Sequence, residues 1–466
     1  MSLSVQQRGS LFLIVTVCLL IVGVCAPFSG HDLQRVMQTA IGLCAVLYGL
    51  SVTPGERLVD RPTALGLALI IALGLVSSAR AHQPLWAFTE VALFIGCGAI
   101  TVAFALLRRH GGEPLDRALM LTVVLLCLIK SIQYLYAGAL AFTSGERTLD
   151  TDLLLSSFSN KRFYGQFQTF TLPLLALPLL MPTVSRTLRG AVFALLCAWW
   201  LIAVSGGTRG TWLGMGVACA VLALLGPWGR RWLGWQLAAV FGGIVLYWLI
   251  FTVLAGYLGI AISADASDRL TTTLSGRGPI WWQGWQMLVE RPWLGFGPMH
   301  FADIANRVAA HPHQAVLQWA GEWGVPSAVC VALLAWRGGW ATLCVIRARR
   351  LSTERADLLR LCLFAALIGA LVQSMVDGVI VMPNSQVWLA LVVGWLMALH
   401  VWQAPAKPVR PLLWTLWKTS SVLAVGLLIV IAVRDVPHIK QAQQQYLDTH
   451  DNLLQPRFWA QGVIAR

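Results

Sequence analysis

The sequence predicts an all-α membrane protein: a polytopic helical bundle of about 12–13 spans with one long loop that contains short helices. Of the 466 residues, 57% are hydrophobic and only 12% are charged, too few charges to cover the surface of a soluble domain. Apolar runs of about 20 residues recur along the chain, and each can cross a hydrocarbon core as a helix. A spanning helix satisfies its own backbone polar groups. Strand-like alternation, the sign of a membrane β-barrel, is absent.

The apolar runs place the spans in order along the chain. They lie at approximately 11–28, 36–52, 63–79, 85–107, 118–142, 166–183, 190–205, 211–227, 233–256, 324–345, 360–382, 385–403 and 413–433. This order gives nine transmembrane helices over 1–256, a loop over 257–323, four further helices over 324–433 and a tail over 434–466.

The charge pattern orients the bundle. The formal net charge is +14, and basic residues cluster in alternate loops, the largest cluster being Arg347, Arg349, Arg350 and Arg355. This is the pattern of the positive-inside rule, so we expect the N-terminus inside and the loop over 257–323 outside. The same distribution argues against a nucleic-acid partner, because the basic residues form no phosphate-binding face.

The last span decides the side of the tail. Lys418 lies in its first half and must extend back to the inner surface if the helix crosses. We expect it to cross, which places the tail from Arg434 outside. A helix that lies flat would leave the tail inside.

The long loop contains a helix signal. Ser275 or a neighbour is expected to cap a helix with Pro279 in its first turn, and the helix then continues over 280–290. Its tryptophans suit a helix at the membrane surface. Arg291-Pro292 is expected to end the helix, Gly295-Phe296-Gly297 to form a turn, and a second short helix to follow at about 301–307.

A histidine pair precedes the next span. Pro312 restricts its neighbours, so we expect His313 near the N-terminus of the following helix, where the helix dipole keeps the imidazole neutral and available as a general base. An interfacial capping histidine fits the spacing equally well. A metal site that joins His311 and His313 to His300 is disfavoured, because no cysteine and few carboxylates accompany them. We therefore predict no metal.

Four basic residues lie on the predicted outer side, against the positive-inside rule. Arg209 lies in a very short turn, Lys161 and Arg162 lie just before a span, and Arg277 opens the loop helix. Several such groups around one point can hold a pyrophosphate without a metal. Taken singly, each is explained by contact with lipid headgroups. Taken together with His313, they favour a site.

These segments resemble the O-antigen ligase family and its relatives in bacterial envelope glycan assembly. The resemblance covers about 155–400. It is carried by Ser205 to Gly210, Ser275 to Trp281, Arg291 to Gly297, His311 to Gln314 and Glu322 to Gly324, with weaker support from Asn160 to Pro173 and Met375 to Pro383. Gln314 is a departure, since relatives often have Asn after the histidine.

The resemblance implies a metal-independent, inverting glycosyltransferase of the bacterial inner membrane, with its active site facing the periplasm and no cofactor. It would ligate an O-antigen glycan from undecaprenyl pyrophosphate to lipid A–core in lipopolysaccharide biosynthesis. His313 would be the general base, with Arg277 and Arg209 stabilising the pyrophosphate. The expected substrate-binding residues are Lys161, Arg162, His311 and Gln314.

Other functions stay open at this point. A repeat-unit polymerase is the second choice, and a protein O-oligosaccharyltransferase is disfavoured by the short tail. A transporter of lipid-linked glycans would use ionisable residues within the spans, for which Lys130, Glu90 and Asp377 are the candidates.

Overall fold

The computed structural model is an all-α bundle and describes residues 4–52, 55–263, 276–401, 408–449 and 454–464. Its first half contains α1 (Val5–Cys25), α2 (His31–Ser51), α3 (Arg61–Ala79), α4 (Pro84–Gly111), α5 (Glu113–Thr143), α6 (Lys161–Leu175), α7 (Leu177–Leu180), α8 (Arg186–Gly206), α9 (Arg209–Ala223) and α10 (Pro227–Trp248). Its second half contains α11 (Ala255–Tyr257), α12 (Arg277–Glu290), α13 (Ala315–Trp323), α14 (Val325–Ala348), α15 (Arg355–Gln373), α16 (Pro383–Ala398), α17 (Pro411–Asp435) and α18 (Ile439–Thr449).

Shorter elements connect these helices. A π-helical turn, η2 (Leu249–Leu254), joins α10 to α11. Strands β1 (Thr148–Leu149) and β2 (Ala261–Ile262) form one parallel pair between the two outer segments. The 3-10 helices are η1 (Thr151–Leu154), η4 (His300–Asp303) and η5 (Val436–His438).

The structure confirms a polytopic helical bundle. Within the described residues, ten of the thirteen predicted segments form helices that are long and apolar enough to cross a membrane. The other three are shorter: the segment at 166–183 is broken at Ala176 between α6 and α7, α9 has 15 residues and α16 has 16. Pro178 at the start of α7 cannot donate a backbone hydrogen bond to the preceding turn, which explains the break.

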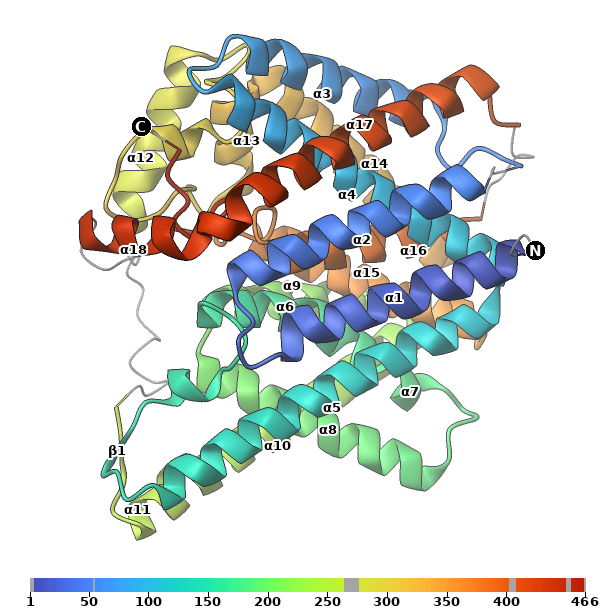
Figure 1. Cartoon of the computed structure of the whole chain (residues 1–466). Helices are drawn as coiled ribbons and strands as arrows, with labels where there is room; N and C mark the ends of the chain where they lie inside the picture. The colour runs from blue at the N-terminus through green and yellow to red at the C-terminus, as the bar shows by residue number, and fades with distance from the viewer. Residues whose placement is uncertain (1–3, 53–54, 264–275, 402–407, 450–453, 465–466) are drawn as a thin grey trace.

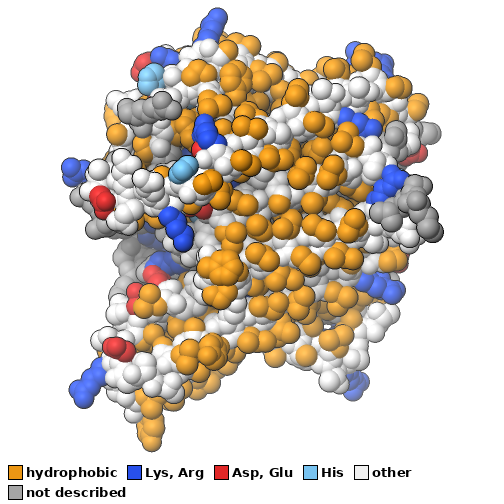
Figure 2. Space-filling model, in the orientation of Figure 1, with side chains coloured by type: hydrophobic (Ala, Val, Ile, Leu, Met, Phe, Trp, Pro, Cys, Tyr) orange, Lys and Arg blue, Asp and Glu red, His pale blue; other side chains and the backbone are white. Residues whose placement is uncertain are grey.

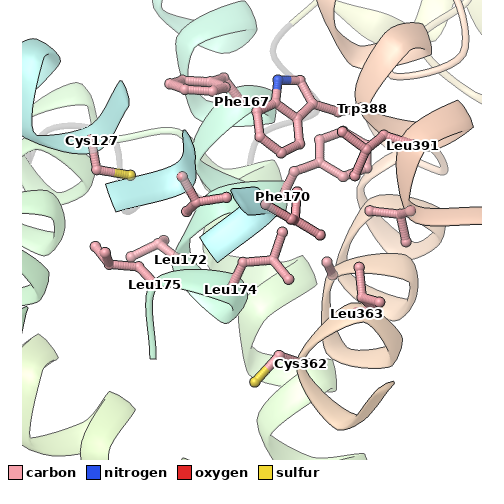
Figure 3. Close-up of a cluster of buried hydrophobic side chains, with 14 of the residues drawn as sticks. Cys127, Phe167, Phe170, Leu172, Leu174, Leu175, Cys362, Leu363, Trp388 and Leu391 are labelled. Carbon is pink, nitrogen blue, oxygen red and sulfur yellow. The ribbon is translucent and has the colours of Figure 1, made fainter. Parts of the chain in front are cut away.

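Helix α6 lies at the centre of the bundle. Every residue from Phe163 to Leu175 is buried. Figure 3 shows Phe167 and Phe170 beside Trp388 of α16, and their ring centroids lie 5.7 and 6.5 Å from the Trp388 ring. Protein therefore surrounds this helix on all sides.

Close packing aligns the outer ends of α6, α9 and α15. A Cβ atom added at Gly165 would lie 2.3 Å from the Thr208 hydroxyl oxygen, and one at Gly214 would lie 2.6 Å from the Gly369 carbonyl oxygen. Small residues allow helix backbones to approach this closely within a membrane bundle. The first turns of α6 and α9 consequently lie beside the last turn of α15.

The two ends of the bundle differ in what they carry. The N-terminus lies at one end, whereas α12, α18 and β1 lie at the other, which we call the loop end (Figure 1). Figure 2 shows hydrophobic side chains across the middle of one face, with most charged groups toward the two ends. This distribution is the one expected of a protein that crosses a bilayer.

The tail also lies at the loop end. The Ile464 N–H donates to the Ala302 carbonyl oxygen (3.1 Å), and the Gln455 amide donates to the Asn306 carbonyl oxygen (2.9 Å). The Lys418 ammonium lies 5.5 Å from the Trp414 ring, back toward the start of α17. This is the arrangement that a crossing last span requires.

One local expectation in the loop needs correction. The predicted helix over 301–307 is only the single 3-10 turn of η4, and the chain is not helical from Ile304 to Gln314. The N-cap position of α12 is Gly276, a neighbour of Ser275, which itself lies outside the described residues. Gly276 has a φ of 73°, in the left-handed region that glycine adopts without strain.

Candidate functional site

Two motifs that are separate in the sequence pair through their backbones. The turn at Gly295-Phe296-Gly297 lies against the end of α13: the Phe296 N–H donates to the Gly321 carbonyl and the Gly297 N–H to the Glu322 carbonyl, both at 3.0 Å. Gly295 has a φ of 67°, and a Cβ atom there would lie 2.4 Å from the Glu322 carbonyl oxygen. Only glycine fits this position, so the turn and α13 form one rigid frame.

The histidine segment is held from three sides. The Trp281 indole N–H of α12 donates to the Pro312 carbonyl (3.0 Å), and the Ala315 N–H donates to the Ser374 carbonyl after α15 (2.9 Å). A Cβ atom at Gly378 would lie 2.5 Å from the His311 ring, so this ring packs directly on the chain between α15 and α16.

His313 occupies an uncommon backbone conformation in this segment. Its φ is 53°, in the left-handed region that few residues other than glycine adopt. It lies immediately before Gln314, the N-cap of α13, as the sequence predicted, and its exposed fraction is only 8%. Such a conformation persists only where surrounding contacts enforce it, and it is frequent at functional sites.

Asp377 faces one nitrogen of His313. Its Oδ1 lies 3.7 Å from His313 Nδ1, just beyond hydrogen-bond range, and Nδ1 has no other partner among the described residues. The carboxylate itself accepts from the Gly378 N–H (2.8 Å) and the Gln373 amide (3.2 Å). A proton on Nδ1 directed at Asp377 would leave Nε2 as the basic nitrogen.

The surroundings keep His313 neutral. Burial, and then the positive charges of Arg162 and Arg277, lower the pKa of His313 to about 3. The pKa of His311 is also lowered well below its usual value, first by burial and then by His313. Their ring centroids lie 4.1 Å apart at an interplanar angle of 73°. At neutral pH both imidazoles are therefore uncharged.

Three arginines share this space. Burial, and then the charges of Arg162 and Arg209, lower the pKa of Arg277, the first residue of α12. Arg277 Nε is buried and has no hydrogen-bond partner among the described residues. Arg162 lies in the first turn of α6, where the Asn160 side chain accepts from its N–H (2.9 Å), and Arg209 begins α9. Arg277 thus interacts electrostatically with Arg162 and Arg209, and both Arg162 and Arg277 act on His313.

The other predicted residues have partners within the protein. The Lys161 ammonium donates to Asp152 Oδ2. The Gln314 side chain accepts from the Leu317 N–H and so caps α13, while its amide nitrogen lies 4.0 Å from Met375 Sδ. The structure therefore brings together His313, His311 and the three arginines, and uses the side chains of Lys161 and Gln314 internally.

Both ring nitrogens of His300 contact backbone groups, which indicates a structural role. Its Nδ1 lies 2.9 Å from the Pro298 carbonyl oxygen, and its Nε2 accepts from the Gln83 N–H at 2.9 Å. Within the described part of the chain, no three His, Cys, Asp or Glu residues are placed to hold a metal ion.

Each ionisable residue considered for a transport pathway has a local partner. Lys130 donates to the Ser156 carbonyl at 2.9 Å, and Glu90 Oε1 lies 3.4 Å from Arg457 Nη2. Asp377 faces His313, a contact that the sequence reasoning missed. In the sequence its motif gives only weak support for the family, and the signal for its role is its place near the outer end of the span predicted over 360–382.

A comparison with protein families finds a match. Residues 191–332 match the model of the family described as O-antigen ligase, a range that includes Arg209, Arg277 and His313. No curated protein matches the chain. The match implies a ligase- or polymerase-type glycosyltransferase that acts on lipid-linked glycans in a multi-pass membrane protein. Over these residues the chain is similar to the O-antigen ligase family, the family that the sequence motifs resemble.

Proposed function

We propose that this protein is a glycosyltransferase of the bacterial inner membrane that ligates an undecaprenyl-pyrophosphate-linked O-antigen glycan to lipid A–core on the periplasmic side. The observation that supports this most strongly is the grouping of three arginines around a buried, neutral histidine. A leaving pyrophosphate needs positive charge, and an attacking hydroxyl needs a base.

The reaction is an inverting displacement. His313 Nε2 takes the proton of the acceptor hydroxyl, and the oxygen forms a bond to C1 of the donor sugar. The bond between C1 and the pyrophosphate oxygen breaks, and undecaprenyl pyrophosphate leaves with the electron pair. One direct attack on the face opposite the leaving group inverts C1.

The arginines stabilise the leaving group. Arg277 and Arg209 would contact the pyrophosphate oxygens, because a planar guanidinium binds two oxygens at once, and Arg162 would add a third charge. The unpartnered Nε of Arg277 leaves one donor ready for such a ligand. This set of charges performs the role that a metal ion has in other transferases, so we expect transfer without a metal.

Asp377 would orient the base. A hydrogen bond from Nδ1–H to this carboxylate would hold the ring and stabilise the imidazolium that forms during attack. The resemblance alone suggested no such partner for His313.

The test is reconstitution of purified protein with an undecaprenyl-pyrophosphate glycan and a lipid A–core acceptor. Wild type and His82→Ala, a control histidine with an exposed side chain at the loop end, are expected to give product, and His313→Ala is not. The product should be inverted at C1, and a chelator should not reduce the rate.

Each other outcome changes the proposal. Product from His313→Ala would remove it as the base. Chelator-sensitive activity restored by a divalent ion, or retention at C1, would contradict the mechanism. Failure of wild type with lipid A–core, together with chain growth from the donor alone, would indicate a repeat-unit polymerase.

A further inference from the structure

The C-terminal segment 455–464 is built into the interior of the loop end. Its buried residues include Gln455, Arg457, Phe458, Trp459, Ala460 and Ile464. Two residues of α2 hold its backbone: His31 Nε2 lies 3.1 Å from the carbonyl oxygens of Arg457 and Phe458, and the Arg35 guanidinium donates to the same two oxygens at 3.0 and 3.1 Å. A loosely attached tail would not engage a buried arginine in this way.

Arg457 connects this segment to the candidate site. Its exposed fraction is 1%, and its Nη2 donates to Glu322 Oε2 at 2.7 Å and lies 3.4 Å from Glu90 Oε1. With the Gln318 amide oxygen turned toward the guanidinium, that oxygen accepts from Arg457 Nη1 at 2.6 Å. One guanidinium thus lies between two carboxylates that belong to α13 and α4.

Glu322 contacts both Arg457 and the loop. Its Oε1 accepts from the Phe301 N–H (2.9 Å), and its backbone carbonyl accepts from the Gly297 N–H (3.0 Å). The helix that carries Glu322 begins next to His313. Since buried carboxylates need a paired charge, loss of the guanidinium would release Glu322 from this arrangement or force it to take up a proton.

We propose that Arg457 is a positioning residue: it fixes Glu322, and through Glu322 it holds the turn at 295–301 and α13 in the geometry that presents His313. Within the described residues, Arg457 does not contact the arginines of the candidate site. We propose no contact between Arg457 and the substrate. Its effect on catalysis rests on the proposed function, whereas its effect on the loop does not.

The test compares Arg457→Met and Arg457→Lys with Lys440→Met, which removes an exposed cation from α18. Amide hydrogen exchange is measured on peptides that cover 295–301 and, as an internal reference, α6. In Arg457→Met, exchange over 295–301 should be faster by about tenfold or more while α6 is unchanged, and Arg457→Lys should restore most of the protection. Lys440→Met should match wild type.

Transfer is measured on the same preparations. We expect kcat of Arg457→Met to fall by about tenfold or more with KM for the donor changed by less than about twofold, and Arg457→Lys to recover most of the loss. If Arg457→Met does not fold, Glu322→Gln replaces it, because this change keeps an acceptor for Phe301 and removes only the charge.

The two readouts separate the claims. Unchanged exchange over 295–301 in both Arg457→Met and Glu322→Gln would overturn the holding role. Faster exchange with unchanged kcat would overturn the catalytic consequence. Absence of transfer by wild type would count against the proposed function, and exchange would still decide whether Arg457 holds the loop.

Discussion

At the scale of single residues, the environment of His313 decides whether it can act as a base. A histidine beside two arginines is poorly suited to hold a proton, since burial and both charges disfavour the imidazolium. In the proposed reaction the same charges would favour the anionic leaving group. Asp377, whose Oδ1 lies 3.7 Å from His313 Nδ1, would supply the opposing charge when the proton arrives.

The pH profile of transfer should reflect this environment. Because the pKa of His313 is lowered to about 3, the base stays unprotonated as pH falls through the usual range of histidine. The rate should therefore stay level from pH 8 to about pH 5. The Arg162→Gln variant lacks one of the charges that lower the pKa of His313. The acid limb of its pH–rate profile should therefore move to higher pH. If the transfer rate of wild type fell with decreasing pH near the ordinary pKa of histidine, this account would be contradicted.

The same shift affects stability. Below the unfolded-state pKa of about 6.5 the unfolded chain binds a proton at this histidine, while the folded protein does not bind it until about pH 3. Stability should thus fall as pH decreases between these values and be independent of His313 above them. His313→Gln should reduce this acid sensitivity in thermal unfolding scans, whereas His82→Gln, at a histidine with an exposed side chain, should not.

Asp377 is tested by an isosteric change. Asp377→Asn removes the charge that stabilises the imidazolium but keeps the size of the side chain, so kcat should fall by on the order of 100-fold with little change in KM. Steady-state kinetics measure both constants. An unchanged kcat would exclude Asp377 as the partner of His313.

At the scale of elements, close helix packing positions the arginines. Arg209 begins α9, and α9 reaches its place through contact of Gly214 with the Gly369 carbonyl of α15. Arg162 depends in the same way on Gly165, which lies against Thr208 and Thr211. The site is therefore assembled by the bundle interior as much as by the long loop.

Two glycines of α9 provide a matched comparison. An added Cβ at Gly214 would lie 2.6 Å from the Gly369 carbonyl oxygen, whereas one at Gly216 would meet nothing within 4 Å. Gly214→Ala should therefore lower stability by about 1–3 kcal/mol and reduce transfer, because α9 must move. Gly216→Ala should be neutral or slightly stabilising. Thermal unfolding in detergent distinguishes them, and equal values would argue against this packing.

The sequence predicted the parts of the site that depend on local signals. His313 before a helix, Arg277 at a helix start and the turn at 295–297 all follow from short-range patterns of Pro, Gly and charge. Contacts between distant segments had no such signal. Arg457 and Glu322 are 135 residues apart in the sequence. The contact between Lys161 and Asp152 depends on how the outer segment folds back. The break between α6 and α7 was also missed, because both halves are apolar and hydropathy does not register a proline.

At the scale of the whole molecule, the candidate site and the tail lie at the same end. Figure 1 places α12 and α18 at the loop end and the N-terminus at the other. Buried contacts of residues 455–464 with α2 and with the loop hold this end together. The fold thus places the tail on the same side as the loop, and the basic loops predict that this side faces the periplasm.

Cysteine labelling can test this orientation. A thiol at Lys440, exposed on α18, should react with a membrane-impermeant maleimide added to cells whose outer membrane is permeabilised. A thiol at Arg186, exposed at the start of α8 on the opposite side, should react only after the inner membrane is disrupted.

Wild type supplies the background from its own cysteines, of which Cys18 and Cys344 are exposed. Labelling of Arg186→Cys but not Lys440→Cys in such cells would show that the bundle has the opposite orientation, with the candidate site on the cytoplasmic side. Labelling of both positions would show that α8 and α18 do not lie on opposite sides of the membrane, against the fold described above.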